Sequence, residues 1–322
     1  MNKQSYSLGI VLSTVTDNSI SEIVEMAILA EKLGYDSVYV NEGRMDALAC
    51  VQAIAEKTNA IDLGTNIANI HYRHPFLTAA TSKIIAEISR GRFSLGLGIS
   101  HKGLLGKINI NAENGRKKLE EHAAFVKLAL QGDVGEGFIK PKRSSFNIPL
   151  YLAGNTRESA ILAGKLGDGL MPYLTPQEHL PILFDYALST FTGADENFNC
   201  VLSIPTFVSD NKMAALSAAK YNLAFFAQLP NYRRQWRRAG YKSAINQLKS
   251  IWTTSKDRHK AAEAIPTELV EQVCLFGSPN DCRSQMTKFF QSGAKEIILA
   301  VSPVDTNRQS ATKDALTQLI GK

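Results

Sequence analysis

Two residues that can hold or move a proton follow apolar, strand-like segments. Glu42 comes after Val38-Tyr39-Val40, separated from it by Asn41, and Ser100 and His101 follow the segment 93–98. A carboxylate at a strand end, shielded from water, can donate a proton or orient the group that does, and histidine can take the same role. The alternatives are a solvated salt bridge for Glu42 and a structural hydrogen bond for His101. Both residues are candidate catalytic groups.

The turn Ala153-Gly154-Asn155-Thr156 has the composition of an anion site. Gly154 allows the backbone to approach a negative group closely, and Asn155 or Thr156 can begin a helix whose free N–H groups attract phosphate. The same residue types also serve as ordinary helix caps. The sequence leaves both interpretations open.

Other kinds of site have little support. The chain has no His-x-x-x-His, His-Glu-x-x-His or Cys-x-x-Cys, so we expect no metal site, and it has no Gly-x-Ser-x-Gly elbow or Walker loop. Four scattered cysteines are typical of a reduced compartment. No apolar run approaches the length of a membrane helix, and we see no secretory signal. We therefore expect a cytoplasmic protein without a membrane segment.

Positive charge is concentrated in one segment. The net charge of the 322 residues is +6, but residues 231–260 alone carry nine basic residues and one acidic residue. A nucleic-acid surface spreads basic residues over several elements, so we expect no nucleic-acid partner. Four arginines with i, i+4 spacing, Arg233, Arg234, Arg237 and Arg238, would share one helix face. This face is either a solvated surface or an anion-binding one.

Short apolar segments alternate with amphipathic helical ones nearly from end to end, and this order positions the candidate residues. We predict strands over residues 6–12, 38–40, 62–68, 93–98, 149–153, 170–171, 200–208 and 296–301. Strands separated by helices pair in parallel through right-handed crossovers. Eight units favour a closed (β/α)₈ TIM barrel over a doubly wound sheet, whose Gly-x-Gly-x-x-Gly fingerprint is missing. Strand-end residues of such a barrel share one face.

The chain is long enough for such a barrel to form one domain over residues 1–322. We predict a helical region over 212–228, an irregular basic stretch after it, and a helix over 281–291. Together these place a helical insertion at 211–266, after the seventh strand.

Several motifs resemble those of the luciferase-like monooxygenase superfamily, in the same order and over almost the whole chain. They include Leu-Gly-Tyr-Asp-Ser-Val-Tyr-Val-Asn-Glu (33–42), Arg-His-Pro (73–75), Ile-Ser-Arg-Gly-Arg-Phe-Ser-Leu-Gly-Leu-Gly (88–98) and Ile-Pro-Leu-Tyr-Leu-Ala-Gly (148–154). Within the superfamily, the chain most resembles methylenetetrahydromethanopterin reductases and their relatives, which use the deazaflavin coenzyme F420. Relatives that bind FMN share most of these motifs.

The resemblance implies a flavin-like ring across the carboxyl ends of the strands. Asn66-Ile67 matches the family's bulge with a non-prolyl cis peptide, and residues 153–156 match its phosphate turn. Glu42 falls where the family places an acidic residue beside the ring. Many relatives carry histidine at the next position, where this chain has Gly43, so His101 is the replacement candidate. The cofactor-binding set implied by the resemblance is Asn41, Asn66, Ile67, Ser100, Ala153, Gly154, Asn155, Thr156 and Gly169.

Three functions fit this resemblance. The leading one is hydride transfer from reduced F420 to an imine, an alkene or a methylene-pterin-like small molecule. The second is an FMN-dependent monooxygenase that takes reduced flavin from a partner flavin reductase. The third is a flavin-binding protein without turnover. The resemblance also implies a homodimer, and it would let the four arginines bind the oligoglutamate tail of F420.

Overall fold

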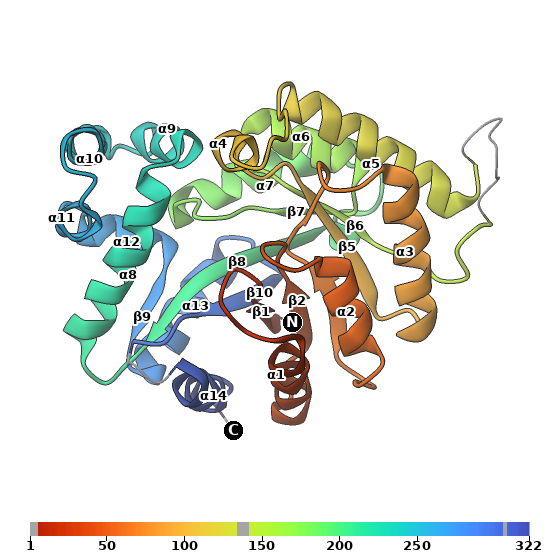
Figure 1. Ribbon diagram of the computed structural model, residues 1–322, viewed down its shortest axis with the longest axis horizontal. Coiled ribbons are helices and arrows are strands. Elements are labelled where there is room, and N and C mark those ends of the chain that lie inside the picture. Colours follow the sequence, from red (N-terminus) through yellow and green to blue (C-terminus); the bar gives the residue numbers. More distant parts are fainter. Residues whose placement is uncertain (1–5, 134–141, 305–307, 322) are drawn as a thin grey trace.

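A computed structural model describes residues 6–133, 142–304 and 308–321, and within them the predicted strands form a closed parallel barrel (Figure 1). Neighbouring strands pair in the order β1 (Ser7–Leu12), β2 (Ser37–Val40), β3 (Asp62–Thr65), β5 (Phe93–Gly98), β6 (Leu150–Ala153), β7 (Gly169–Met171) and β8 (Asn199–Val208). Strand β10 (Glu296–Val301) pairs with both β8 and β1 and closes the ring. The barrel prediction is confirmed.

Helices cover the outside of the barrel, and each turns its apolar face inward. Helix α1 (Ile20–Leu33), for example, buries Ile23, Met26, Ala27 and Ala30, which recur at helical spacing. The other covering helices are α2 (Ala47–Ala55), α3 (Pro75–Ile88), α5 (Gly115–Gln131), α6 (Arg157–Leu166), α7 (Leu180–Leu188), α13 (Pro279–Gln291) and α14 (Arg308–Leu319). In the described ranges, no helix has the length and apolar character needed to cross a membrane.

The barrel interior is a packed core and not a pore. Its apolar side chains are Tyr39, Tyr151, Met171, Val201 and Ile298. At the amino-terminal end of the strands the carboxylate of Glu296 is buried and accepts hydrogen bonds from the side chains of Ser37, Tyr39 and Asn199. Burial raises the pKa of Glu296. This polar cluster closes the end of the barrel opposite the candidate residues.

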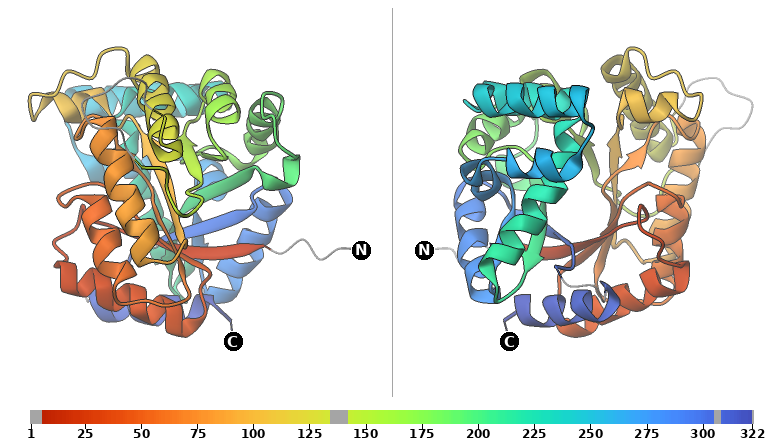
Figure 2. Two further views of the ribbon diagram at one scale, coloured as in Figure 1. Left: turned by 90° about the vertical axis from the view of Figure 1, so that its right-hand side faces the viewer. Right: turned by 60° about the vertical axis from the view of Figure 1, so that its left-hand side comes forward.

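The segment after β8 differs from the prediction. Helix α8 (Lys212–Ala227) was expected, but the stretch predicted to be irregular contains α9 (Pro230–Arg238), α10 (Lys242–Thr254), α11 (Arg258–Glu263) and α12 (Thr267–Val273). These helices gather at one side of the barrel (Figures 1 and 2) around a core of their own. Tyr232 and Trp236, four residues apart among arginines, supply the buried face of α9. Strand β9 (Leu275–Gly277), also not predicted, pairs with the end of β8.

The loops contain small additional elements, all but η2 (Asp195–Asn197) at the carboxyl ends of the strands. The strand predicted over 62–68 is divided into β3 and β4 (Ala68–Asn69), and the Asn66–Ile67 peptide between them is cis, as predicted. Helix α4 (Lys102–Gly106) follows β5, and short 3₁₀ turns lie at η1 (Gln177–His179) and η2 (Asp195–Asn197). Helices α4 and α9 lie beside each other over the strand ends (Figure 1), where the ring of His101 contacts the ring of Tyr232.

Candidate active site

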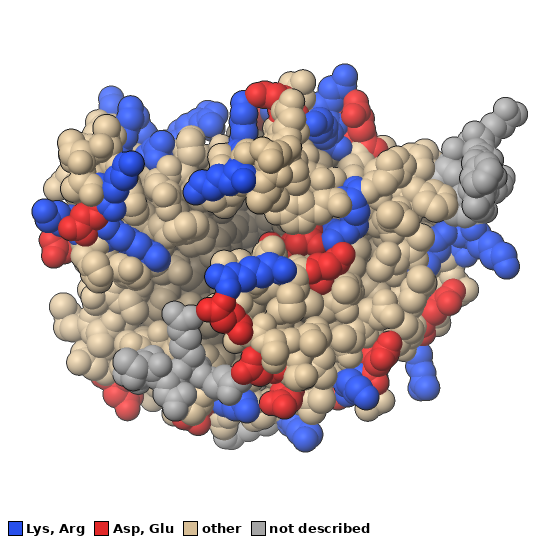
Figure 3. All heavy atoms as spheres, viewed as in Figure 1, with Lys and Arg blue, Asp and Glu red and all other residues tan. Residues whose placement is uncertain are grey.

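A cavity of about 1330 Å³ lies between the carboxyl ends of the strands and the helices inserted after β8. Figure 3 shows this hollow with basic side chains around its opening. Ten of the predicted site residues line it: Asn41, Glu42, Asn66, Ile67, Ser100, His101, Ala153, Gly154, Asn155 and Thr156. The fold therefore brings together residues from four strand ends, those of β2, β3, β5 and β6, as the barrel prediction required.

The structure does not bring Gly169, predicted as a cofactor-binding residue, to the cavity. Gly169 is the first residue of β7 and pairs with Asn199, the first residue of β8. It therefore lies at the amino-terminal end of the barrel, whereas Met171, at the other end of the same strand, lines the cavity. A three-residue strand is long enough to separate these two environments.

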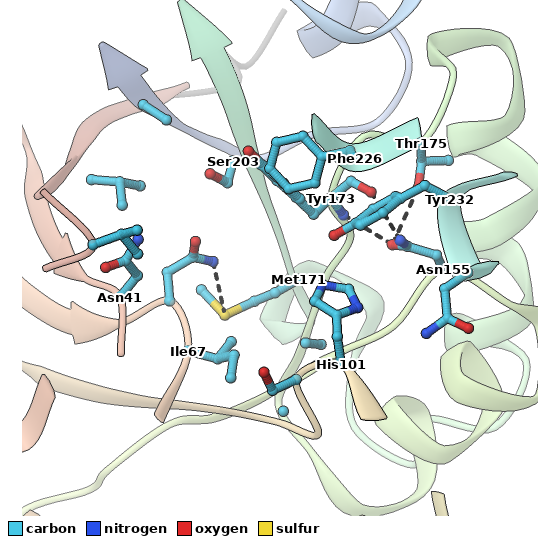
Figure 4. Close-up of a pocket in the computed structure, with 18 of the residues that line it drawn as sticks. Asn41, Ile67, His101, Asn155, Met171, Tyr173, Thr175, Ser203, Phe226 and Tyr232 are labelled. Atoms are coloured by element: carbon cyan, nitrogen blue, oxygen red, sulfur yellow. Dashed lines mark hydrogen bonds between the residues drawn. The ribbon is translucent and has the colours of Figure 1, made fainter. Parts of the chain in front are cut away.

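The floor of the cavity is mainly apolar. Ile67, which follows the cis peptide, and Met171 of β7 point into it from neighbouring parts of the barrel (Figure 4). The side-chain amide of Asn66 lies 3.8 Å from the Met171 sulfur. Val11 and Ala153 also line this region. Such a floor suits the face of an extended ring system.

Glu42 lines the cavity, but its carboxylate is engaged by the protein. Arg73 donates to both of its oxygens, with Nη1 3.0 Å from Oε2, and the backbone N–H groups of Ala47 and Asn69 donate to it as well. The side chain of Glu42 is 2% exposed and that of Arg73 11%. Four donors around one carboxylate favour a salt bridge over a catalytic role, but this salt bridge is buried and not solvated as the alternative expected. The four bonds tie the loops after β2 and β4 together.

Position 43 has no room for a side chain. A Cβ atom at Gly43 would lie 2.8 Å from Cγ2 of Val15 and 2.9 Å from Oγ1 of Thr14. The loop after β1 occupies the space that a side chain at this position would need.

The side chains of the turn after β6 form hydrogen bonds with other residues of the protein. A Cβ atom at Gly154 would lie 2.4 Å from Oγ of Ser159, so the space of this glycine is filled by serine. The side chain of Thr156 accepts from the Ser159 N–H at 3.3 Å, and Ser159 accepts in turn from the Thr156 N–H at 2.9 Å. This is a capping box at the start of α6. What the turn can offer an anion is the amino-terminal end of α6.

Asn155 joins the turn to the inserted helices. Its amide oxygen accepts from the N–H of Tyr173 at 2.9 Å, and its amide nitrogen donates to the Gln235 side chain at 3.0 Å. Gln235 donates to the Thr175 hydroxyl at 2.9 Å, and Trp236 donates to a carbonyl of the same loop. These bonds fix α9 against the loop after β7 and so set the place of Tyr232, one turn earlier on α9.

The roof of the cavity is aromatic and carries free polar atoms (Figure 4). The ring of Tyr232 lies 5.4 Å from that of His101, 5.2 Å from Phe226 and 6.2 Å from Tyr173, measured between centroids. In the described part of the chain, neither the His101 ring nor the Tyr232 hydroxyl has a hydrogen-bond partner. Burial lowers the pKa of His101 and raises that of Tyr232, so both are neutral near pH 7. They form a pair of hydrogen-bond donors that line the cavity.

The four arginines of α9 separate into two rows. Arg234 and Arg238 line the cavity. Arg233 donates to the carbonyl oxygens of Ala227, at 2.9 Å, and Gln228, and so caps the end of α8. Arg237 is exposed and lines neither this cavity nor the small pocket around Arg233.

Two other arginines complete the positive lining. Arg116 of α5 and Arg238 act electrostatically on Glu158, in the first turn of α6. The pKa of Glu158 is lowered first by a hydrogen bond from its own backbone N–H and then by one with the side chain of Thr156. The positive charges of Arg116 and Arg238 lower it further. Arg116 and Arg238, from different helices, therefore line the cavity together with Glu158, within electrostatic range of the start of α6, where the helix dipole also favours anions. Arg258 of α11 lines the opposite wall.

Sequence reasoning did not identify Tyr232, Phe226, Arg116 or Arg258. The apolar spacing of Tyr232 and Trp236 was a usable signal for α9, because the two are four residues apart. Arg116 and Arg258 had no local signal, since only the packing of helices brings them to the cavity.

Comparison with known proteins gives a consistent result. The model of the family described as luciferase-like monooxygenase matches residues 6–296. A 5,10-methylenetetrahydromethanopterin reductase of Methanolobus tindarius is 25% identical over 95% of this chain and 98% of its own. The coenzyme F420 dependent tetrahydromethanopterin reductase of Methanopyrus kandleri has a similar structure, with a TM-score of 0.80, 17% identity and 98% of each chain covered. The oxygenating constituent of 3,6-diketocamphane monooxygenase from Pseudomonas putida, solved with FMN, has a TM-score of 0.69, 16% identity and coverage of 98% and 97%.

Proposed function

The chain belongs to the luciferase-like monooxygenase family, and we propose that it is an oxidoreductase that uses coenzyme F420 to reduce an imine, an alkene or a methylene-pterin-like molecule. The reductase relative named above supports this choice. The class of substrate that this chain reduces is inferred from the residues of its site.

The residues around the cavity fit a deazaflavin and a small substrate. Ligand cavities usually measure about 300–1,000 Å³, so a cavity of about 1330 Å³ is large enough for both. The apolar floor of Ile67 and Met171 suits a planar ring. The side chains of Asn66 and Ser203 add polar atoms at its edge.

One observation carries the preference for F420 over FMN: Arg116 and Arg238, from two different helices, line the same cavity as the first turn of α6. FMN carries a single phosphate, whereas F420 carries a phosphodiester and an oligoglutamate tail. An arginine pair with Arg234 nearby at the cavity wall matches the larger number of anionic groups.

The protein's own residues have distinct parts in this proposal. When bound, coenzyme F420 supplies the hydride from its reduced central ring. Tyr232 can give its phenol proton to the reduced substrate and regain it from solvent, and His101 can do so only after it has taken up a proton from solvent as imidazolium; both lie on the roof of the cavity. Glu42 holds the loops after β2 and β4 through Arg73, and Asn155 holds α9 through Gln235. The aromatic roof limits the access of water.

Fluorescence titration with F420 and with FMN tests the proposal. We expect F420 to bind at least about tenfold more tightly than FMN, since a charge-assisted hydrogen bond contributes about 1.5–3 kcal/mol. Arg238→Gln should weaken F420 about tenfold, and Arg237→Gln, a matched change outside the cavity, less than about twofold. Equal or tighter binding of FMN would overturn the choice of F420.

Measurements of oxygen consumption and of cofactor oxidation distinguish two other functions from this one. Consumption of oxygen with reduced FMN would support a monooxygenase, which the similarity to the FMN-bound structure makes the second candidate and which would need a partner flavin reductase. Binding of F420 without its oxidation by any reducible substrate would indicate a binding protein.

We also propose a cytoplasmic homodimer. All four cysteines, Cys50, Cys200, Cys274 and Cys282, are free and buried, as suits a reduced compartment. Sedimentation velocity would test the oligomeric state.

A further inference from the structure

Arg258 lies on the wall of the cavity formed by the inserted helices and is held in a fixed position. Its Cζ atom lies 3.9 Å from the centroid of the Tyr221 ring and 5.7 Å from that of Phe225. Its Nε donates to the carbonyl oxygen of Tyr221 at 2.9 Å. Stacking on two rings and one backbone bond order a guanidinium that would otherwise be mobile.

The charge of Arg258 has no acidic partner in the described ranges. None of their salt bridges includes it. The adjacent Asp257 is occupied as the cap of α11, where its carboxylate accepts from the N–H groups of His259 at 2.9 Å and Lys260 at 3.2 Å. Guanidinium has five N–H donors, and one of them is used, so the two terminal nitrogens remain available to a ligand in the cavity.

This positive group is separate from the one at α6. Arg258 starts α11, which packs on α8, whereas Arg116 and Arg238 act on Glu158 of α6. Figure 1 shows α11 on the far side of the inserted helices from α6. The aromatic side chains of Phe225 and Phe226 line the wall on the α8 side. The cavity therefore has two positive regions joined by an apolar one.

We propose that Arg258 binds the carboxylate or phosphate of an anionic substrate whose reducible group lies against the cavity floor. A rigid guanidinium fork matches both anions through two parallel hydrogen bonds. The inference rests on the proposed function, since it assigns the region at α6 to the cofactor and the Arg258 region to the substrate. It narrows the substrates to molecules that carry a negative group at one end and a planar or apolar body.

Binding of three naphthalene probes tests this assignment without knowledge of the substrate. The negative probes are 2-naphthoate and 2-naphthyl phosphate, which distinguish the two anions, and 2-naphthamide is the neutral control of the same shape. Each is titrated by calorimetry against the protein, with and without oxidised F420. We expect at least one anion to bind about 10- to 100-fold more tightly than the amide.

Variants locate the effect. Arg258→Gln should bring the anions to within about twofold of the amide, Arg258→Lys should retain part of the preference, and Arg237→Gln should leave it unchanged. Thermal denaturation of each variant checks that it is folded. Equal binding of anion and amide by the wild type, or an unchanged preference in Arg258→Gln, overturns the proposal.

F420 affinity separates this inference from the proposed function. If Arg258→Gln weakens F420 itself by tenfold, Arg258 belongs to the cofactor site and the inference is wrong. If the wild type does not bind F420 but still prefers the anions through Arg258, the cofactor proposal fails and the anion site stands.

Discussion

Replacing Glu42 with glutamine would remove a buried negative charge while keeping the shape of the side chain. The carboxylate accepts from Arg73 and from the backbone N–H groups of Ala47 and Asn69, and it is 2% exposed. Glutamine offers a single acceptor and presents an amide nitrogen to one of these donors. The positive charge of Arg73, 11% exposed, would then be poorly compensated.

The size of the effect follows from this environment. Breaking a buried ion pair by removing one partner costs about 3–5 kcal/mol. Asp46 remains 2.9 Å from Nη2 of Arg73, and glutamine keeps one carbonyl acceptor. We therefore expect Glu42→Gln to lower the free energy of unfolding by about 2–3 kcal/mol, with F420 affinity changed by less than about threefold in protein that is still folded.

Urea denaturation followed by circular dichroism measures this loss. Asp17→Asn is the control, because Asp17 forms a salt bridge with Arg44 in which both side chains are more than half exposed, and such pairs contribute about 0–1 kcal/mol. If Glu42→Gln unfolds at the same urea concentration as the wild type and loses turnover, the structural interpretation of Glu42 is wrong and the residue is catalytic.

Burial lowers the pKa of His122 from 6.5 to about 4. Between these pH values the unfolded chain binds a proton at this histidine that the folded chain does not, so the free energy of unfolding should fall by about 3 kcal/mol as the pH drops from 6.5 to 4. In urea titrations at a series of pH values, the unfolding free energy of His122→Gln should depend less on pH than that of the wild type. The same dependence on pH in both proteins would contradict the assignment to His122. Gly43→His should destabilise the protein by about 1–3 kcal/mol, because its Cβ meets Val15, and a thermal midpoint at or above that of the wild type would disprove the crowding. Tyr232→Phe should keep F420 affinity within about twofold but lower turnover about tenfold or more, with an altered pH profile, and normal turnover would leave His101 as the single proton donor.

The barrel could be predicted because its signals are local. Each strand is a short apolar run, and each helix that follows carries its own periodic pattern, so the alternation of eight units is visible without any knowledge of contacts. The parallel barrel then requires that the strand ends meet, which is why Asn41, Ser100 and Gly154 were placed at one cavity from the sequence alone.

The roles of the predicted residues were harder to predict than their places. Glu42 and Arg73 are 31 positions apart, and Asn155 and Gln235 are 80 apart, so each pairing depends on how separate segments pack. A glycine in a turn likewise does not indicate whether a ligand or a neighbouring side chain occupies the position that a Cβ atom would take; at Gly154 it is the side chain of Ser159. Tyr232 and Phe226 of the roof were missed for the same reason, because their positions depend on how α8 and α9 pack, and hydrogen bonds to the loop after β7 fix α9.

The bonds that seat α9 on the barrel limit how this protein can be altered by exchange of segments. A chimera that receives residues 211–266 of a relative would acquire a new roof, but Asn155 and the 173–175 loop would still belong to the old one. Gln235 and Trp236 bond to that loop, so a donor helix without them would rest on unpaired polar groups. To change the substrate, the inserted helices should therefore be exchanged together with the residues at positions 155 and 173–175, because these segments are hydrogen-bonded to one another.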